Sequence, residues 1–149
     1  MIQRVQTLFL IGVGIISALL FIIPVFYFTE TSGVVWVISL NPMPHGKIIT
    51  GEFYSFVIIN IIIPILSIFT ILKFKNRNLQ YKLANLIALL NIILIGLFFL
   101  LDFIKPNVTG SISYKFGLAL PIISGILAYL AAHFIKKDEL MVRNADRIR

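Results

Sequence analysis

The chain has 149 residues, of which 59% are hydrophobic and 13% are charged, and its mean hydropathy is +1.00. Soluble domains usually carry about 25% charged residues, so this composition is typical of a membrane protein, and the length predicts one domain of four or five spans without a separate soluble domain. The absence of cysteine excludes disulfides, thiolate metal sites and a cysteine nucleophile. The net charge is +7, but the sequence shows no face that combines basic and aromatic residues, as nucleic-acid binding requires.

The first apolar run covers residues 7–28 and is followed by no small-residue cleavage site. A signal peptide has an apolar region of about 7 to 15 residues, whereas this run has 22 and ends in bulky aromatics. It therefore predicts a retained spanning helix. Gly14 and Ala18 are four residues apart, so we expect them on one face where another helix can approach closely.

Residues 29–53 form a polar interval that is rich in glycine and proline and too irregular to span a membrane. Two β-branched runs, residues 34–40 and 47–50, are separated by turn-forming residues and predict a small β-hairpin in this outer loop. The alternative is an interfacial loop anchored by Trp36 at the level of the lipid headgroups.

The second predicted span covers residues 54–72, and Asn60, Pro64 and Ser67 in it follow helical spacing. This stripe is expected to face protein and not lipid. Pro64 has no N–H, so the carbonyl of Asn60 loses its helical partner. The segment that follows, residues 73–82, holds four basic residues and no acidic ones, which predicts a tight positive hairpin.

The third predicted span covers residues 83–103. At about 1.5 Å per residue, Asn91 should lie as deep in the membrane as Pro64 on the antiparallel neighbour. We therefore expect the Asn91 amide to donate a hydrogen bond to the free carbonyl of Asn60, an interaction of about 0.6 kcal/mol.

The fourth predicted span covers residues 116–135 and is the richest in small residues, among them Gly125 and Ala128. Small residues permit close helix crossings that are stabilised by van der Waals contact. This helix is expected at the centre of the bundle or of an oligomer.

The basic residues predict the orientation. With four spans, ten Lys and Arg residues fall on the side of the two termini and three on the other side. The four apolar spans predict an all-α four-helix bundle. The positive-inside rule then places both of its termini in the cytoplasm.

Acidic and histidine side chains are few and do not predict an active site. Asp102 and His133 end their spans on opposite sides, about 30 Å apart. An outer metal site from His45 with Glu30, Glu52 or Asp102 has little support, because one histidine without a ligand-spaced partner is a weak signal. No ionisable residue lies near the middle of a span, as a proton or ion pathway would require. We expect a protein that is not an enzyme and has no cofactor.

The last residues, 136–149, form a charged tail that can continue the fourth helix. If it is helical, Phe134, Met141, Ala145 and Ile148 lie along one stripe, so the tail would be amphipathic and suited to lipid headgroups or to a groove on a cytoplasmic partner. Its candidate contact residues are Lys136, Lys137, Arg143, Arg147 and Arg149.

Three stretches carry a family resemblance: MIQRVQT at residues 1–7, KNRNLQ at residues 75–80, and residues 135–149, which end in KKDELMVRNADRIR. Together they resemble the domain of unknown function 4293 family, small four-pass membrane proteins typical of Bacteroidota. The resemblance implies a Gram-negative inner-membrane location and no known activity.

These observations predict an accessory or assembly subunit of an inner-membrane complex that contacts membrane lipids and either a protein partner or further copies of itself. The alternative is a carrier of lipids or small apolar solutes, which would need a closed cavity lined by Asn60, Ser67 and Asn91.

Overall fold

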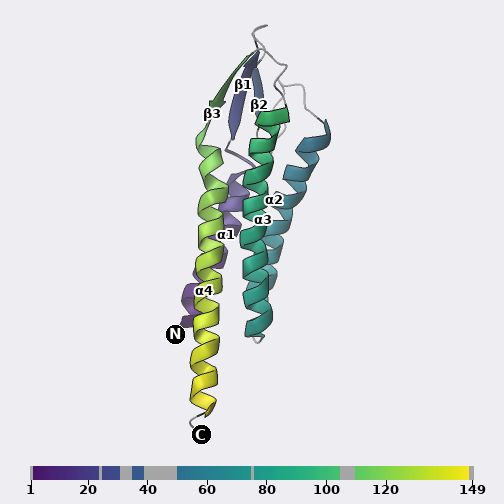
Figure 1. Ribbon diagram of the computed structural model, residues 1–149. Coiled ribbons are helices and arrows are strands. Elements are labelled where there is room, and N and C mark those ends of the chain that lie inside the picture. The colour runs from purple at the N-terminus through teal and green to yellow at the C-terminus, as the bar shows by residue number, and fades with distance from the viewer. Residues whose placement is uncertain are drawn as a thin grey trace.

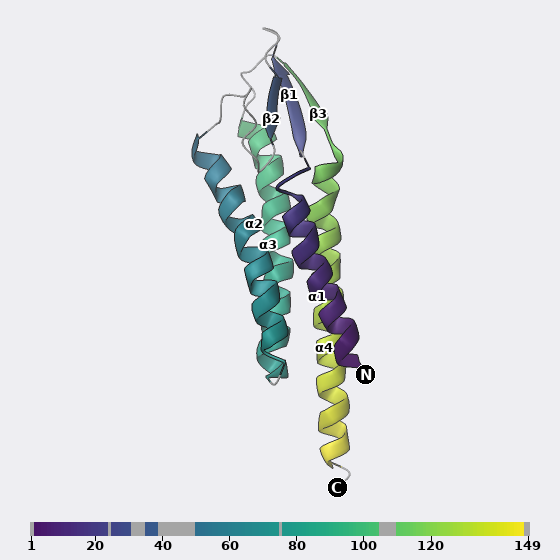
Figure 2. The same cartoon turned by 180° about the vertical axis from the view of Figure 1, so that it is seen from behind.

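The computed structural model describes residues 2–23, 25–30, 35–38, 50–74, 76–104 and 110–147. These residues form the helices α1 (Ile2–Leu19), α2 (Thr50–Leu72), α3 (Arg77–Ile104) and α4 (Ala119–Arg147), the strands β1 (Phe26–Glu30), β2 (Val35–Ile38) and β3 (Gly110–Tyr114), and a short 3-10 helix, η1 (Phe116–Leu118). The helices run alternately up and down, and both termini lie at the end of the bundle opposite the strands (Figure 1). Figure 2 shows the same arrangement from behind, with α1 between α2 and α4.

The buried positions of α1 to α3 recur every three and four residues in turn. In α2 they are Phe56, Asn60, Ile63, Ser67 and Thr70, and α1 and α3 follow the same rule. A repeat of 3.5 residues keeps one seam of each helix on the bundle axis and is typical of left-handed bundle packing. Each helix contacts two neighbours, and α4 makes the most extensive contacts, with α3 and α1.

The outer surface of the bundle is apolar. Large hydrophobic side chains such as Ile15, Ile65 and Ile92 are more than half exposed, while polar residues such as Asn60 and Asn91 are buried. Soluble monomers rarely expose apolar patches of more than a few hundred Å², so this surface fits lipid. Three stretches are long and apolar enough to cross a membrane, namely Ser55–Leu72, Arg77–Leu100 and Phe116–Asn144, and the apolar stretch of α1, Val5–Leu19, is shorter.

The first helix ends earlier than predicted. It stops at Leu19, where Ile22 and Ile23 both donate backbone hydrogen bonds to its carbonyl at 2.9 Å. A proline at position 24 disfavours helical geometry in the residue before it. The prediction of one helix through residue 28 is therefore wrong, because residues 26–28 belong to β1.

A three-stranded antiparallel sheet in the order β2-β1-β3 caps the end of the bundle away from the termini. Phe28 pairs with Trp36 of β2 on one side and with Ile112 of β3 on the other. β2 lies inside the predicted strand run at residues 34–40, but it pairs with β1. Of the second run of the predicted hairpin, residues 47–50, the first three lie outside the described residues and Thr50 begins α2.

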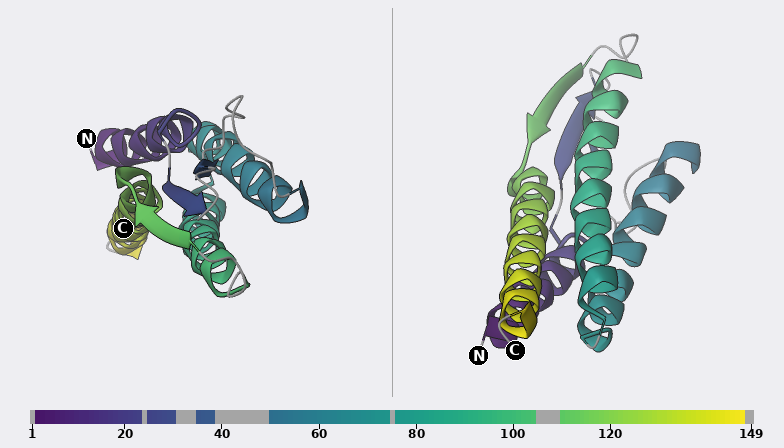
Figure 3. Two further views of the ribbon diagram at one scale, coloured as in Figure 1. Left: turned by 90° about the horizontal axis from the view of Figure 1, so that it is seen from above. Right: turned by 60° about the horizontal axis from the view of Figure 1, so that its bottom comes forward.

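The connection between α2 and α3 is tight. Asn76 caps α3, because its Oδ1 accepts a hydrogen bond from the backbone N–H of Leu79 at 3.1 Å, an N-cap interaction. At the other end of the bundle, α2 leans away from α4 (Figure 3). Of the four helices, α2 thus diverges from α4 toward the sheet.

Candidate functional site

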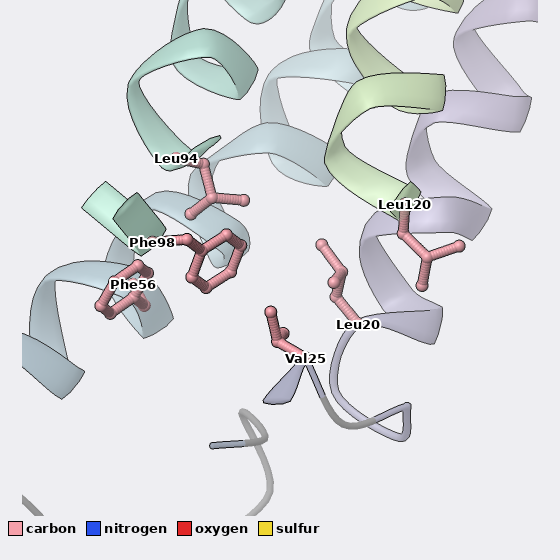
Figure 4. Packing of buried hydrophobic residues seen from close by; sticks show 6 residues of the cluster. All are labelled: Leu20, Val25, Phe56, Leu94, Phe98 and Leu120. Carbon is pink, nitrogen blue, oxygen red and sulfur yellow. The ribbon is translucent and has the colours of Figure 1, made fainter. Parts of the chain in front are cut away.

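Each of the four helices contributes one buried polar residue to the middle of the core: Ser17 from α1, Asn60 from α2, Asn91 from α3 and Ser124 from α4. On the sheet side they are bordered by a hydrophobic cluster of Leu20, Val25, Phe56, Leu94, Phe98 and Leu120 (Figure 4). On the side of the termini they are bordered by a second cluster of Leu10, Val13, Ile63, Ile87, Ala128 and Ala131. On each helix, the polar residue occupies the core position between a residue of the first cluster and a residue of the second, so the four lie at one depth in the bundle. We call these four residues the polar layer.

The two amides of the polar layer donate to backbone carbonyls. Asn60 Nδ2 donates to the carbonyl of Ser17 at 2.9 Å and so links α2 to α1. Asn91 Nδ2 donates to the carbonyl of Ile87, one turn back in α3, at 2.9 Å. The predicted hydrogen bond from Asn91 to the carbonyl of Asn60 is therefore wrong, because the amide nitrogen donates within its own helix.

Further polar residues join the helices at the end with the termini. Ser67 Oγ donates to the carbonyl of Leu10 in α1 at 2.5 Å, and Gln6 Nε2 donates to the carbonyl of Phe134 in α4 at 3.1 Å. The predicted protein-facing stripe of α2 is confirmed for Asn60 and Ser67, which are buried, whereas Pro64 is half-buried at its margin.

The small residues divide into an inner and an outer set. Ala128 is buried, and a Cβ added at Gly125 would lie 3.4 Å from the Cβ of Asn91, so both lie at helix contacts. Ala18 is exposed, and a Cβ at Gly14 would meet nothing within 4 Å. Among the described residues, the expected contact at Gly14 and Ala18 is thus not made, since the core seam of α1 runs through Val13 and Ser17 instead.

The close contact of α1 is at a glycine that the sequence analysis did not select. A Cβ at Gly12 would lie 3.2 Å from Cδ1 of Leu127 in α4, tighter than ordinary van der Waals contact. The signal was present in the sequence, because Gly12 directly precedes a residue of the 3.5-residue seam.

Residues 136–147 of the charged tail form the C-terminal part of α4, which projects beyond the other helices (Figure 1). Arg77, at the start of α3, holds the base of this projection: its Nη1 lies 3.0 Å from Oδ2 of Asp138 and 3.1 Å from the carbonyl of the same residue. Lys136 lies over the ring of Tyr81, 5.5 Å from its centre. The helix therefore leaves the bundle after residue 138, and we call residues 139–147 the arm.

The arm presents apolar and basic side chains to its surroundings. Leu140, Met141 and Val142 are between 41% and 49% exposed, and Arg143 is exposed beside them. Phe134 is not part of this surface, because it is half-buried and stacks on Phe9 with ring centres 5.6 Å apart. The predicted stripe is therefore interrupted where the bundle ends, and its last member, Ile148, lies outside the described residues.

The remaining candidates are placed as follows. Lys136 and Lys137 are exposed at the base of the arm, Arg147 is the last residue of α4, and Arg149 lies outside the described residues. His45 also lies outside them. Among the side chains that the structure describes, no three His, Cys, Asp or Glu residues gather as a metal site would require.

The comparisons with known proteins bear on the whole chain. The search of curated proteins gave no match. A family model with the description "Domain of unknown function (DUF4293)" matches residues 2–148, nearly the whole length. The polar layer, the packed helices and the arm all lie within this match, and the chain belongs to the DUF4293 family.

Proposed function

We propose that the protein is a non-enzymatic, four-pass subunit of the bacterial inner membrane that helps to assemble or hold together a membrane complex. The apolar outer surface supports the membrane location. Three stretches are long and apolar enough to cross the hydrocarbon layer of about 30 Å, whereas the apolar stretch of α1, Val5–Leu19, covers about 22 Å at 1.5 Å per residue. In the proposed four-pass topology, α1 crosses together with the apolar residues 20–23 that follow it.

The charge distribution supports an orientation with both termini in the cytoplasm. Basic residues gather at the end of the bundle with the termini, where Lys73, Arg77, Lys82 and Lys136 lie. Lys115 lies at the opposite end, next to β3. Positive charge in short loops is retained on the cytoplasmic side during insertion, so the arm would project into the cytoplasm.

The single observation that carries the proposal is the arm. It exposes Leu140, Met141 and Val142 outside the bundle, and the carboxylate of Asp138 at its base is engaged by Arg77. This region therefore combines exposed apolar side chains with basic ones, Lys137 and Arg143, and the sequence interleaves them with the acidic Glu139 and Asp146. That combination fits an apolar groove rimmed by charged groups of both signs on the cytoplasmic face of a partner subunit.

Crosslinking in native membranes, purification in mild detergent and mass spectrometry test this proposal. The unaltered protein should yield a reproducible crosslinked partner, and the triple variant Arg143→Gln, Arg147→Gln, Arg149→Gln should lose it while inserting normally. The matched control is Lys73→Gln with Lys82→Gln, which removes basic residues at the same end of the bundle but outside the arm, and should retain the partner.

Two results would contradict the proposal. One is an unaltered protein that is always monomeric and without a reproducible partner. The other is a specific lipid retained in native mass spectrometry with no protein partner, which would favour the carrier of lipids or small apolar solutes instead.

A further inference from the structure

The polar layer contains four oxygen atoms that the chain itself does not satisfy. Among the side chains that the structure describes, Ser17 Oγ, Asn60 Oδ1, Asn91 Oδ1 and Ser124 Oγ are buried without a hydrogen-bond partner. All four residues are at most 1% exposed. An unsatisfied buried polar group costs about 1–3 kcal/mol, so four of them at one level of the core favour the binding of a ligand.

The orientation of the two amides follows from their partners. The backbone carbonyls of Ser17 and Ile87 can only accept, so the groups that face them must be the donating Nδ2 atoms of Asn60 and Asn91. Reversing either amide would break its hydrogen bond. The free atom of each amide is therefore the acceptor Oδ1, and each serine adds a hydroxyl that can donate.

We propose that the polar layer binds one buried water molecule at the centre of the bundle. Two amide oxygens accept and two hydroxyls donate, and a water molecule offers the complementary two donors and two acceptors. Buried waters in proteins make about three hydrogen bonds, with a range of two to four, so this set is sufficient to hold one. The water would connect all four helices at the level where Asn60 already joins α2 to α1.

A monovalent cation is the alternative occupant, because all four free atoms are oxygens. The residues of the polar layer are neutral, however, and both neighbouring levels of the core are hydrophobic clusters. An ion there would be desolvated without a compensating charge, which is costly inside a membrane. The balance of donors and acceptors favours water.

Water-edited solid-state NMR on carbon-labelled protein in deuterated lipid bilayers tests this inference. Magnetisation from water protons should reach Asn60 Cγ and Asn91 Cγ rapidly, while Ile87 and Leu94 in the adjoining clusters receive it slowly. The double variant Ser17→Ala, Ser124→Ala should reduce the transfer to both amides to the level of Ile87. Ser67→Ala is the matched control, since Ser67 donates to Leu10 outside the layer, and it should leave the transfer unchanged.

Either of two results would overturn the inference. Slow transfer to both amides in the unaltered protein would show a dry layer. A saturable change of the Asn60 and Asn91 signals when choline chloride is replaced by sodium or potassium chloride would show a bound cation. If the double variant does not fold, Ser124→Ala alone should still lower the transfer, because it removes one of the two donors.

Discussion

The core is built differently on the two sides of the polar layer. Toward the sheet it consists of large side chains, and Phe56 of α2 stacks on Phe98 of α3 with ring centres 4.7 Å apart and planes at 12°. Toward the termini it contains small residues, which are Ala84, Ala128, Ala131 and Ala132, and the helices there are joined by hydrogen bonds from Gln6 and Ser67.

This difference explains the shape of the bundle. Lipid offers no hydrophobic incentive for helices to associate, so close backbone packing and hydrogen bonds must hold them together. At the end with the termini, small residues permit the close packing, and Gln6 and Ser67 supply the hydrogen bonds. Phenylalanine rings fill the core at the other end, where α2 leans outward (Figure 3) and the sheet joins the chain after α1 to the chain before α4. The end with the termini should therefore be sensitive to added volume, and the sheet end to lost volume.

Phe56→Ala should cause the largest loss. It removes a buried ring from the sheet end and leaves a cavity beside Phe98, which should lower the free energy of unfolding by about 2–3 kcal/mol. This is less than the usual cost in soluble proteins, because the unfolded chain also remains in lipid. Unfolding by SDS in mixed micelles measures it, with exposed Phe99→Ala as control; equal losses for the two would contradict the assignment of Phe56 to the core.

Ala128→Leu should have the next largest effect. The added side chain overfills the closely packed contact of α4 and should destabilise the protein by about 1–2 kcal/mol. Ala18→Leu adds the same volume on an exposed face of α1 and should change little. The same SDS titration distinguishes them, and a neutral Ala128→Leu would show that this end of the bundle is not tightly packed.

The difference in free energy of unfolding between Asn60→Ala and Asn91→Ala should be smaller than the two effects above. Both shorten an asparagine of the polar layer, but only the Asn60 side chain donates to another helix. Asn60→Ala should therefore lower the free energy of unfolding by about 0.6 kcal/mol more than Asn91→Ala, which is the average contribution of a hydrogen bond between membrane helices. Identical unfolding curves for the two variants would contradict the observed donor assignments.

A gain in stability, and not a loss, is expected at two glycines of α1. Gly14→Ala should stabilise the protein by up to about 1 kcal/mol, because alanine is the better helix former and its Cβ meets nothing. Gly12→Ala gains the same propensity but brings a Cβ to 3.2 Å from Leu127, so its net gain should be lower. A larger gain at Gly12 than at Gly14 would show that the contact relaxes freely.

Much of the helical architecture could be predicted from the sequence, because long apolar runs and short loops are local signals. The end of α1 could not, since the apolar run continues through residue 28 and hydropathy does not distinguish a helix from a strand in Phe26–Glu30. The partner strand β3 lies some eighty residues further along the chain, and nothing local to either strand indicates the pairing.

The polar layer was predicted in part. Asn60 and Asn91 are conspicuous because amides are rare in spans, whereas Ser17 and Ser124 are common in membrane helices and were not selected for a shared site. Their signal was their position in the 3.5-residue seam of each helix. The acceptor carbonyls could not be predicted, because several carbonyls lie at similar depth around each amide nitrogen.

The topology of the arm is the central claim, and cysteine labelling tests it most directly because the chain contains no cysteine of its own. Single cysteines at Ser111 in β3 and at Asn144 in the arm should be treated with a membrane-impermeant maleimide in right-side-out spheroplasts. We predict that Ser111→Cys reacts at once and that Asn144→Cys reacts only after the membrane is permeabilised. Labelling of Asn144→Cys in sealed spheroplasts would contradict both the cytoplasmic arm and the function proposed for it.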